Sequence, residues 1–165
     1  MQLPRLMDVC YTYGGGMAAN PGLSKTYLDT PYMAVQADPQ WVGLEIRALA
    51  SSEDFRHGME VCLHALDVTQ TTRLLMDLRK MRLVLVDDER WLAQDLLPRF
   101  ATTALKRMAV VRPENALARA IVADLAKPRP TGTESKHCET VEEAKKWLSG
   151  TERSMALAPA TASPR

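Results

Sequence analysis

The chain has 165 residues, enough for one domain with its own hydrophobic core. Its 21 Lys and Arg residues nearly balance its 20 Asp and Glu residues, which leaves a formal net charge of +1. That balance argues against a nucleic-acid-binding protein with a general basic surface, because phosphate neutralisation needs clustered Lys and Arg. A hydrophobic fraction of 46% is typical of a folded domain rather than of a disordered chain.

The cysteines and the first residues favour a cytoplasmic protein of bacterial type. Cys10, Cys62 and Cys138 are too few and too scattered for a disulfide framework, and no Cys-x-x-Cys pair is present to bind zinc. The N-terminal residues lack the apolar stretch of a signal peptide. No run approaches the roughly 18 apolar residues of a membrane span. We therefore expect reduced thiols and no membrane span.

The two ends of the chain differ from the middle. Residues 1–24 are interpreted as an irregular arm, and the glycine run 14–16 within it lacks the Lys and Ser/Thr of a phosphate-binding loop. The arm carries the apolar side chains Leu3, Leu6, Met7, Tyr11 and Tyr13. Because exposed apolar segments usually pack against a surface, we expect the arm to mediate weak homodimerisation. Residues 150–165 are small, Pro-containing and aperiodic, which predicts a disordered tail.

The middle of the chain begins with strands. Lys25 to Asp38 is predicted to be extended, and Trp41 to Leu49 alternates apolar with other residues at the period of a half-buried strand. Asp38 and Pro39 form a turn, so the two segments are predicted to pair as an antiparallel hairpin. A helix follows with Ser51 as N-cap and Asp54 three residues later. Its predicted buried face contains Phe55, Met59, Cys62, Leu63 and Leu66.

Strands and helices alternate in the rest of the chain. A strand is predicted at Arg73–Asp77 and an apolar run at Leu83–Val86, followed by a helix from Asp87 that carries Trp91, Leu92, Leu96, Phe100 and Ala104. A strand at Arg107–Val111 comes next, and then a helix from Pro113 whose apolar stripe is Leu117, Ala120, Ile121 and Leu125. After a Pro/Gly loop at 127–132, we predict an edge strand at Ser135–Glu139 and a helix capped by Thr140 and Glu143 that buries Ala144, Trp147 and Leu148. This alternation predicts an α/β fold: a mostly parallel sheet covered by helices, with the hairpin as its antiparallel edge.

Four carboxylates form the most informative polar group. Asp77 ends a predicted parallel strand, where open α/β sheets place their ligand sites, whereas Asp87, Asp88 and Glu89 lie at a helix N-terminus. A carboxylate there caps free amides, so capping accounts for Asp87 or Asp88 without any function. Magnesium binding is the alternative for these oxygens, but the sequence offers no phosphate-binding motif beside them. Trp91, one turn further, is expected in the core.

Two histidine-containing groups have a structural and a chemical interpretation each. His57, Glu60 and His64 share the helix face opposite the apolar one, which suits either a solvated surface or a metal ion at an interface. His137 and Cys138 are adjacent in a predicted strand and therefore point to opposite faces, so they cannot form a nucleophile–base pair. We expect a buried Cys138 and an exposed His137, with no metal, cofactor or catalytic residue.

Five segments carry a family resemblance: SSEDFRHGMEVCLHAL, LLMDLRKMRLV, DDERWLAQDLLPRF, ALKRMAVVRPEN and ETVEEAKKWLSG. From Lys25 to Leu148 the sequence resembles the SpoIIAA-like branch of the STAS superfamily, the sulfate transporter and anti-sigma factor antagonist domains. The resemblance implies a mixed, mostly parallel sheet of four or five strands with about four helices, spanning 25–149.

The resemblance also implies a function as a regulatory binding module rather than an enzyme. In anti-sigma factor antagonists, a Ser in an Asp-Ser-Ser-Gly type segment at the start of the second helix is phosphorylated. In this chain Asp87 matches the Asp, Asp88 the phosphorylated Ser, Glu89 the next Ser and Arg90 the Gly. The segment VDDER contains no hydroxyl group in any register, which departs from the phosphorylated pattern.

Two functional hypotheses follow. The first is a non-enzymatic module that binds a protein partner, or a second copy, through the surface around the second helix. The second rests on a fold-level likeness to CRAL-TRIO lipid-binding domains: a small lipophilic ligand held between helix and sheet near Met76, Met81 and Trp91.

Overall fold

The computed structural model describes residues 24–125 and 132–150. The arm predicted at 1–24 and the tail predicted at 150–165 lie outside the described residues, except for Ser24 and Gly150. Most of the loop predicted at 127–132 also lies outside them.

The N-terminal part of the sheet is a three-stranded antiparallel meander. It consists of β1 (Lys25–Asp29), β2 (Met33–Ala37) and β3 (Val42–Ile46). The segment predicted as one extended stretch is therefore two strands joined by a turn. The hydroxyl of Thr30 accepts a hydrogen bond from the amide of Met33 at 3.0 Å, and Pro31 favours the turn conformation. The sheet consequently has six strands, one more than the upper expected number.

Helix α1 (Ser52–Thr69) crosses from the meander to the parallel part of the sheet. Its N-cap is Ser51, whose hydroxyl accepts a hydrogen bond from the amide of Asp54 at 3.1 Å, as predicted. The predicted apolar face is also confirmed, because all five of its side chains are buried. Burial of this face against β2 and β3 is the main hydrophobic stabilisation of the helix.

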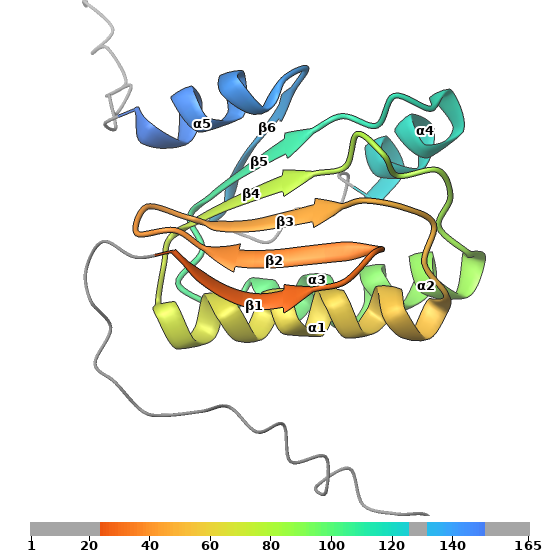
Figure 1. Cartoon of the computed structure of the whole chain (residues 1–165), viewed down its shortest axis with the longest axis horizontal. Helices are drawn as coiled ribbons and strands as arrows, with labels where there is room; N and C mark the ends of the chain where they lie inside the picture. Colours follow the sequence, from red (N-terminus) through yellow and green to blue (C-terminus); the bar gives the residue numbers. More distant parts are fainter. Residues whose placement is uncertain (1–23, 126–131, 151–165) are drawn as a thin grey trace, which may run out of the picture.

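The remaining strands are parallel, with the order β1-β2-β3-β4-β5-β6 across the sheet. They are β4 (Arg73–Asp77), β5 (Arg107–Val111) and the edge strand β6 (Glu134–Cys138), each joined to the next by a helical crossover. Figure 1 shows α1 below the sheet and α5 (Val141–Ser149) above it. The hydroxyl of Thr140 caps α5 by accepting a hydrogen bond from the amide of Glu143 at 3.1 Å, as predicted.

The sheet carries two hydrophobic cores of unequal size. The larger core fills the space between the α1 face of the sheet and the segments from α1 to α4, and the smaller core lies under α5. Consecutive residues of β4 supply both cores: Leu74 belongs to the larger and Leu75 to the smaller. The alternation of side chains along a strand thus divides one sheet between two helical layers.

The helical segment after β4 differs from the prediction. The structure divides it into α2 (Val86–Trp91), a π-helical turn η1 (Leu92–Leu96) and α3 (Leu97–Phe100). Pro98 has no amide hydrogen for the usual bond four residues back, and the amide of Leu97 bonds to the carbonyl of Leu92 instead. Ala104, predicted in the helix, lies beyond its end.

Helix α4 (Ala116–Leu125) also begins later than predicted. Its cap is Asn115 rather than Pro113: the side-chain oxygen of Asn115 accepts hydrogen bonds from the amides of Leu117 and Ala118. The buried face of the helix contains Ala118 and Val122, whereas Leu117 is 59% exposed. The predicted stripe was therefore wrong at Leu117 and at Ala120, which is also exposed.

Candidate functional site

Asp88 is buried between two helices. It lies in the first turn of α2, and its residue is only 3% exposed. One carboxylate oxygen accepts a hydrogen bond from the hydroxyl of Ser52 at 2.8 Å, and the other accepts one from Nε of Arg56 at 2.7 Å. Both donors belong to α1, so this contact fastens the start of α2 to the start of α1. A buried carboxylate requires such partners because desolvation of an unpaired charge is costly.

The capping role predicted for Asp87 or Asp88 is wrong. The N-cap of α2 is Leu85, and no side chain caps the helix. Asp87 points to solvent, with 79% of its side chain exposed, and forms an ion pair with Arg90 at 3.3 Å. Glu89 is half-buried. The helix starts one residue earlier than predicted, at Val86, and Asp88 lies on the side of the helix that faces α1.

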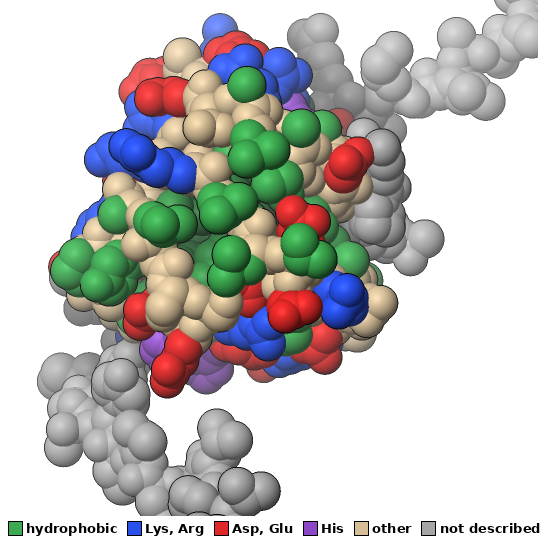
Figure 2. Space-filling view, turned by 90° about the vertical axis from the view of Figure 1, so that its right-hand side faces the viewer, with side chains coloured by type: hydrophobic (Ala, Val, Ile, Leu, Met, Phe, Trp, Pro, Cys, Tyr) green, Lys and Arg blue, Asp and Glu red, His purple; other side chains and the backbone are tan. Residues whose placement is uncertain are grey.

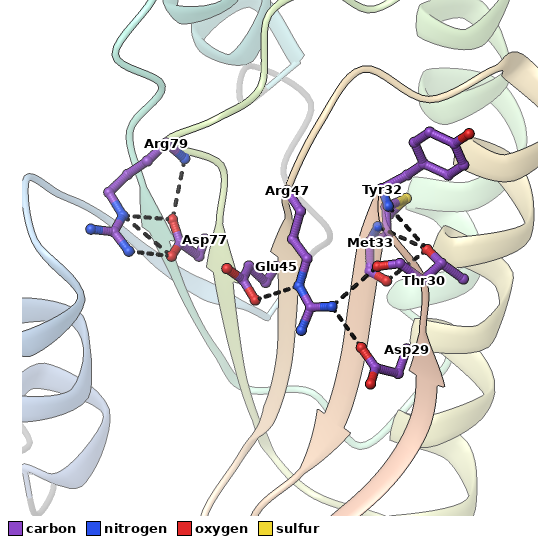
Figure 3. A network of polar contacts seen from close by, with 8 residues as sticks. All are labelled: Asp29, Thr30, Tyr32, Met33, Glu45, Arg47, Asp77 and Arg79. Carbon is purple, nitrogen blue, oxygen red and sulfur yellow. Dashed lines mark hydrogen bonds and ion pairs between the residues drawn. The ribbon is translucent and has the colours of Figure 1, made fainter.

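Asp77 lies on the face of the sheet opposite to α1 and α2. Figure 3 shows the polar side chains around it. It is the last residue of β4, as predicted, and it lies two positions after Leu75, so both side chains are on the sheet face of the smaller core. Arg79 donates from Nε and Nη2 to its two oxygens at 2.9 and 2.8 Å, and the contact raises the pKa of Arg79. The negative charge of Asp77 is therefore balanced by Arg79, and Asp77 lies apart from the carboxylates of α2.

A second group of ion pairs adjoins Asp77 on the same sheet face. Glu45 of β3 is the register partner of Asp77 and accepts a hydrogen bond from Nε of Arg47 at 3.0 Å. Arg47 also forms an ion pair with Asp29 of β1 at 2.6 Å. Figure 3 shows the side chains lying in a row across the strand ends. Each carboxylate in this row has an arginine partner, and the Arg47–Asp29 ion pair links the end of β3 to β1. We therefore interpret the row as structural.

Exposed apolar side chains surround the position of Asp88. The run Leu83–Val86 comprises the end of the loop before α2 and the first residue of that helix, and Val84 is its one buried member. Leu83 is 43% exposed, Leu85 51% and Val86 68%. Figure 2 shows hydrophobic side chains gathered across the centre of this face of the molecule.

The β3–α1 connection and the β1–β2 turn complete this face. Leu49 is 58% exposed, and Tyr32 is 38% exposed. The carbonyl of Tyr32 accepts hydrogen bonds from the amides of Arg47 and Ala48, which holds the two connections together. We call Tyr32, Leu49, Leu83, Leu85 and Val86 the apolar face.

A depression of about 160 Å³ lies in the apolar face. Its lining is mostly hydrophobic, with two charged residues: Met33, Ile46, Ala48, Leu49, Ala50, Phe55, Met81, Arg82, Leu83, Val84, Leu85 and Asp88. The apolar run 83–86 is the part of the sequence that could have indicated this site. Its side chains other than Val84 are exposed because the run is not a strand of the sheet. The partners of Asp88 on α1 were not foreseen, because nothing in the sequence links residues 32 and 36 positions apart.

A second apolar cavity, of about 100 Å³, lies between the sheet and the helical segments α1, η1, α3 and α4, and it shares Phe55 and Met81 with the lining of the depression. Met76 and Met81, two residues of the predicted ligand pocket, line it. Trp91 does not: its ring packs at the edge of the larger core, with the guanidinium of Arg56 at 5.4 Å from its centroid. Polar side chains enter the lining only from the β6 side, at Thr133, Ser135 and His137.

The two histidine-containing sets of the sequence analysis, at residues 57–64 and 137–138, are described by their contacts. Glu60 forms a two-point ion pair with Arg99 of α3 at 2.6 and 2.7 Å, which raises the pKa of Arg99. The ring of His64 meets that of Tyr27 edge-on at 6.3 Å, whereas His57 is exposed. Within residues 24–125 and 132–150, no three His, Cys, Asp or Glu side chains are arranged to hold a metal ion. Cys138 is buried, as predicted, and His137 is half-buried rather than exposed.

Comparison with known proteins agrees with the fold. None of the helices in the described part of the chain has the length and apolar character needed to cross a membrane. Neither a curated protein nor a solved structure gives a significant match. A sequence model of the family described as SpoIIAA-like matches residues 33–149, from β2 to the end of α5. That range contains five of the six strands, with the antiparallel β2–β3 pair followed by the parallel strands, and the chain belongs to the SpoIIAA-like family.

Proposed function

We propose that the protein is a non-enzymatic interaction module that binds a protein partner through the apolar face beside α2. The observation that carries this proposal is a set of five exposed large hydrophobic side chains, of which Leu49, Leu83 and Leu85 line one depression. Single exposed apolar residues are ordinary on protein surfaces, but a gathered set around a concavity is typical of an interaction site. Membership of the SpoIIAA-like family supports a regulatory role.

Binding at this face is constitutive in our proposal. Residues 86–90, which correspond to the phosphorylated segment of regulated relatives, contain no hydroxyl group. Asp88, at the phosphoacceptor-equivalent position, is already bound to Ser52 and Arg56. A phosphorylated side chain acts by adding charge and new hydrogen bonds, whereas here the charge and its partners are permanent. The start of α2 is thus fixed in one arrangement, without kinase input.

The test is affinity purification of the tagged protein from the cells in which it naturally occurs. The wild-type protein should retain a partner in a fixed ratio, and Leu85→Asp should lose it because a carboxylate is placed in the apolar face. Leu117→Asp is the matched control, since Leu117 is exposed to a similar degree on α4 and does not line the depression. Retention of the partner by Leu85→Asp would contradict the proposal.

The second candidate function, binding of a small lipophilic ligand, is supported by the cavity lined by Met76 and Met81. A cavity of about 150 Å³ holds benzene in an engineered protein, so a space of about 100 Å³ suits only a smaller group unless the walls move. This size places the ligand hypothesis second. Native mass spectrometry of the protein from its source cells decides: a co-purifying lipophilic molecule, lost on Met76→Trp substitution, would favour it.

A further inference from the structure

Arg82 gives the depression beside α2 a charge that the protein itself does not neutralise. It is one of the two charged residues in the lining, and it is exposed. Across residues 24–125 and 132–150, no ion pair or side-chain hydrogen bond engages Arg82. The arginines nearby in sequence, Arg79 and Arg90, each have a carboxylate partner.

Asp88, the other charged residue of the lining, does not balance Arg82. Its two oxygens are taken by Ser52 and Arg56, and its side chain is only 4% exposed. A ligand in the depression therefore meets an apolar floor and one available positive charge at Arg82. Electrostatic complementarity then selects a partner that brings a negative charge.

We propose that the depression binds an apolar side chain of a protein segment that carries a carboxylate next to it, with the carboxylate paired to Arg82. This inference rests on the proposed function and specifies the chemistry of the partner. The depression of about 160 Å³ is close to the size of a cavity that holds benzene, so it accommodates one aromatic or branched aliphatic side chain.

A membrane surface fits these observations less well than a peptide. Binding to anionic lipids relies on several clustered Lys and Arg residues, whereas Arg82 is the one cation among the described residues of the lining and the whole chain has a net charge of +1. The site is also concave, which suits insertion of a partner's side chain into the protein. Vesicles of anionic lipid are therefore the competing arm of the test.

The experiment measures binding of two dye-labelled peptides of equal length by fluorescence anisotropy at low salt. One peptide contains leucine, glycine and glutamate, and the other contains leucine, glycine and lysine. The full-length protein should bind the glutamate peptide about two- to fivefold more tightly, which is the contribution of one exposed ion pair. Arg82→Glu should reverse this preference. Arg90→Glu, a charge reversal outside the lining, should leave it unchanged.

The outcomes separate this inference from the proposed function. Equal binding of the two peptides, with both lost in Leu85→Asp, would overturn the role of Arg82 and leave the apolar face as a binding site. Binding that persists in Leu85→Asp would overturn both. Sedimentation of the protein with anionic vesicles, together with no binding of either peptide, would replace a protein partner with a membrane.

Discussion

A buried carboxylate at the start of α2 depends on donors from another helix. Asp88 is almost fully enclosed, while its partner Arg56 keeps 38% of its side chain exposed and lies over the ring of Trp91. An ion pair of this kind contributes less to folding than its Coulomb energy suggests, but the loss of one partner leaves the other without compensation. The contact therefore specifies how α2 sits on α1.

The first prediction concerns this ion pair. Asp88→Ala and Arg56→Ala should each lower the free energy of unfolding by about 1–3 kcal/mol, and the double variant should cost less than the sum of the two. Asp88→Ser should also destabilise the protein, because the shorter, uncharged serine side chain has one oxygen in place of the two that Ser52 and Arg56 contact and leaves Arg56 without its carboxylate. Urea unfolding measures all of these. Asp87→Ala is the control with an expected effect within about 0.5 kcal/mol; an equal cost at Asp87 would restore the capping interpretation.

The second prediction concerns the buried thiols. Burial raises the pKa of Cys62 to about 12, and it also raises the pKa of Cys138. Because the thiolate is the reactive form, neither thiol should react with a disulfide reagent at about pH 8 in native Cys10→Ser protein, and both should react in denaturant. Rapid modification of either thiol without denaturant would show that the two cores open readily.

The raised pKa of Cys62 also fixes the sign of a pH effect. The unfolded thiol ionises near its ordinary pKa of about 8.5, whereas the native thiol stays protonated up to about 12. Ionisation of this thiol therefore favours the unfolded state. The stability that the protonated Cys62 contributes is fully present below about pH 8.5 and is lost as the pH rises toward about 12.

Helix α1 and strand β2 approach closely at one glycine. A Cβ atom on Gly58 would lie 2.6 Å from Sδ and 2.7 Å from Cε of Met33, a side chain only 1% exposed. Glycine inside a helix is less favourable than alanine by about 1 kcal/mol. The position thus trades helix propensity for close packing of the helix on the sheet.

The third prediction tests that trade. Gly58→Ala should destabilise the wild-type protein by about 1 kcal/mol, because overpacking outweighs the gain in helix propensity. In a Met33→Ala background the space is free, and the same substitution should stabilise the protein relative to Met33→Ala alone. Thermal or urea unfolding of the four proteins measures both effects. A stabilising Gly58→Ala in the wild-type background would show that Met33 moves aside freely.

At the scale of the whole molecule, the two cores share the central strands. Helix α5 packs mainly on β4, β5 and β6, and β4 and β5 also contribute side chains to the larger core. Arg107 of β5 ties down the end of α5: its guanidinium donates to the carbonyl of Gly150 at 2.8 Å and lies over the ring of Trp147 at 4.8 Å. We therefore expect the cores to unfold together.

The fourth prediction follows from this shared sheet. Leu148→Ala in the smaller core should lower the free energy of unfolding by about 2–5 kcal/mol, since Leu148 is fully buried. Urea transitions followed by circular dichroism and by tryptophan fluorescence should coincide. Leu117→Ala, at an exposed position, is the control and should have little effect. Two separate transitions would mean that α5 unfolds on its own.

The fifth prediction concerns residues 1–24, which lie outside the described residues except for Ser24. From the apolar side chains of the arm we expect weak homodimerisation, measured by sedimentation of the full chain. A chain beginning at Ser24 should show less dimer at the same concentration. An unchanged mass distribution would exclude the arm as the cause of self-association.

The sequence by itself determined the elements that depend on local patterns. The alternation of strands and helices, the buried face of α1 and the caps at Ser51 and Thr140 follow from hydrophobic period and short-range hydrogen bonding. Errors arose where one local signal was overlooked or weighed too heavily, as with Pro98 in the helix after β4 and Pro113 before α4. Pro98 lies where the predicted helix is divided, and Pro113 lies before the start of α4. The turn at Thr30 and Pro31 was also overlooked, and it divides the predicted extended stretch into β1 and β2.

Only the tertiary structure decided the candidate site. The sequence singled out Asp77, Asp87, Asp88 and Glu89 together, but side-chain alternation in β4 sends Asp77 to the opposite sheet face from α2. The packing of α2 on α1 places Asp88 against Ser52 and Arg56, which are 36 and 32 positions away in the sequence. The apolar face likewise combines side chains from three connections. Burial and ion pairing depend on neighbours far apart in sequence, and no local pattern encodes those neighbours.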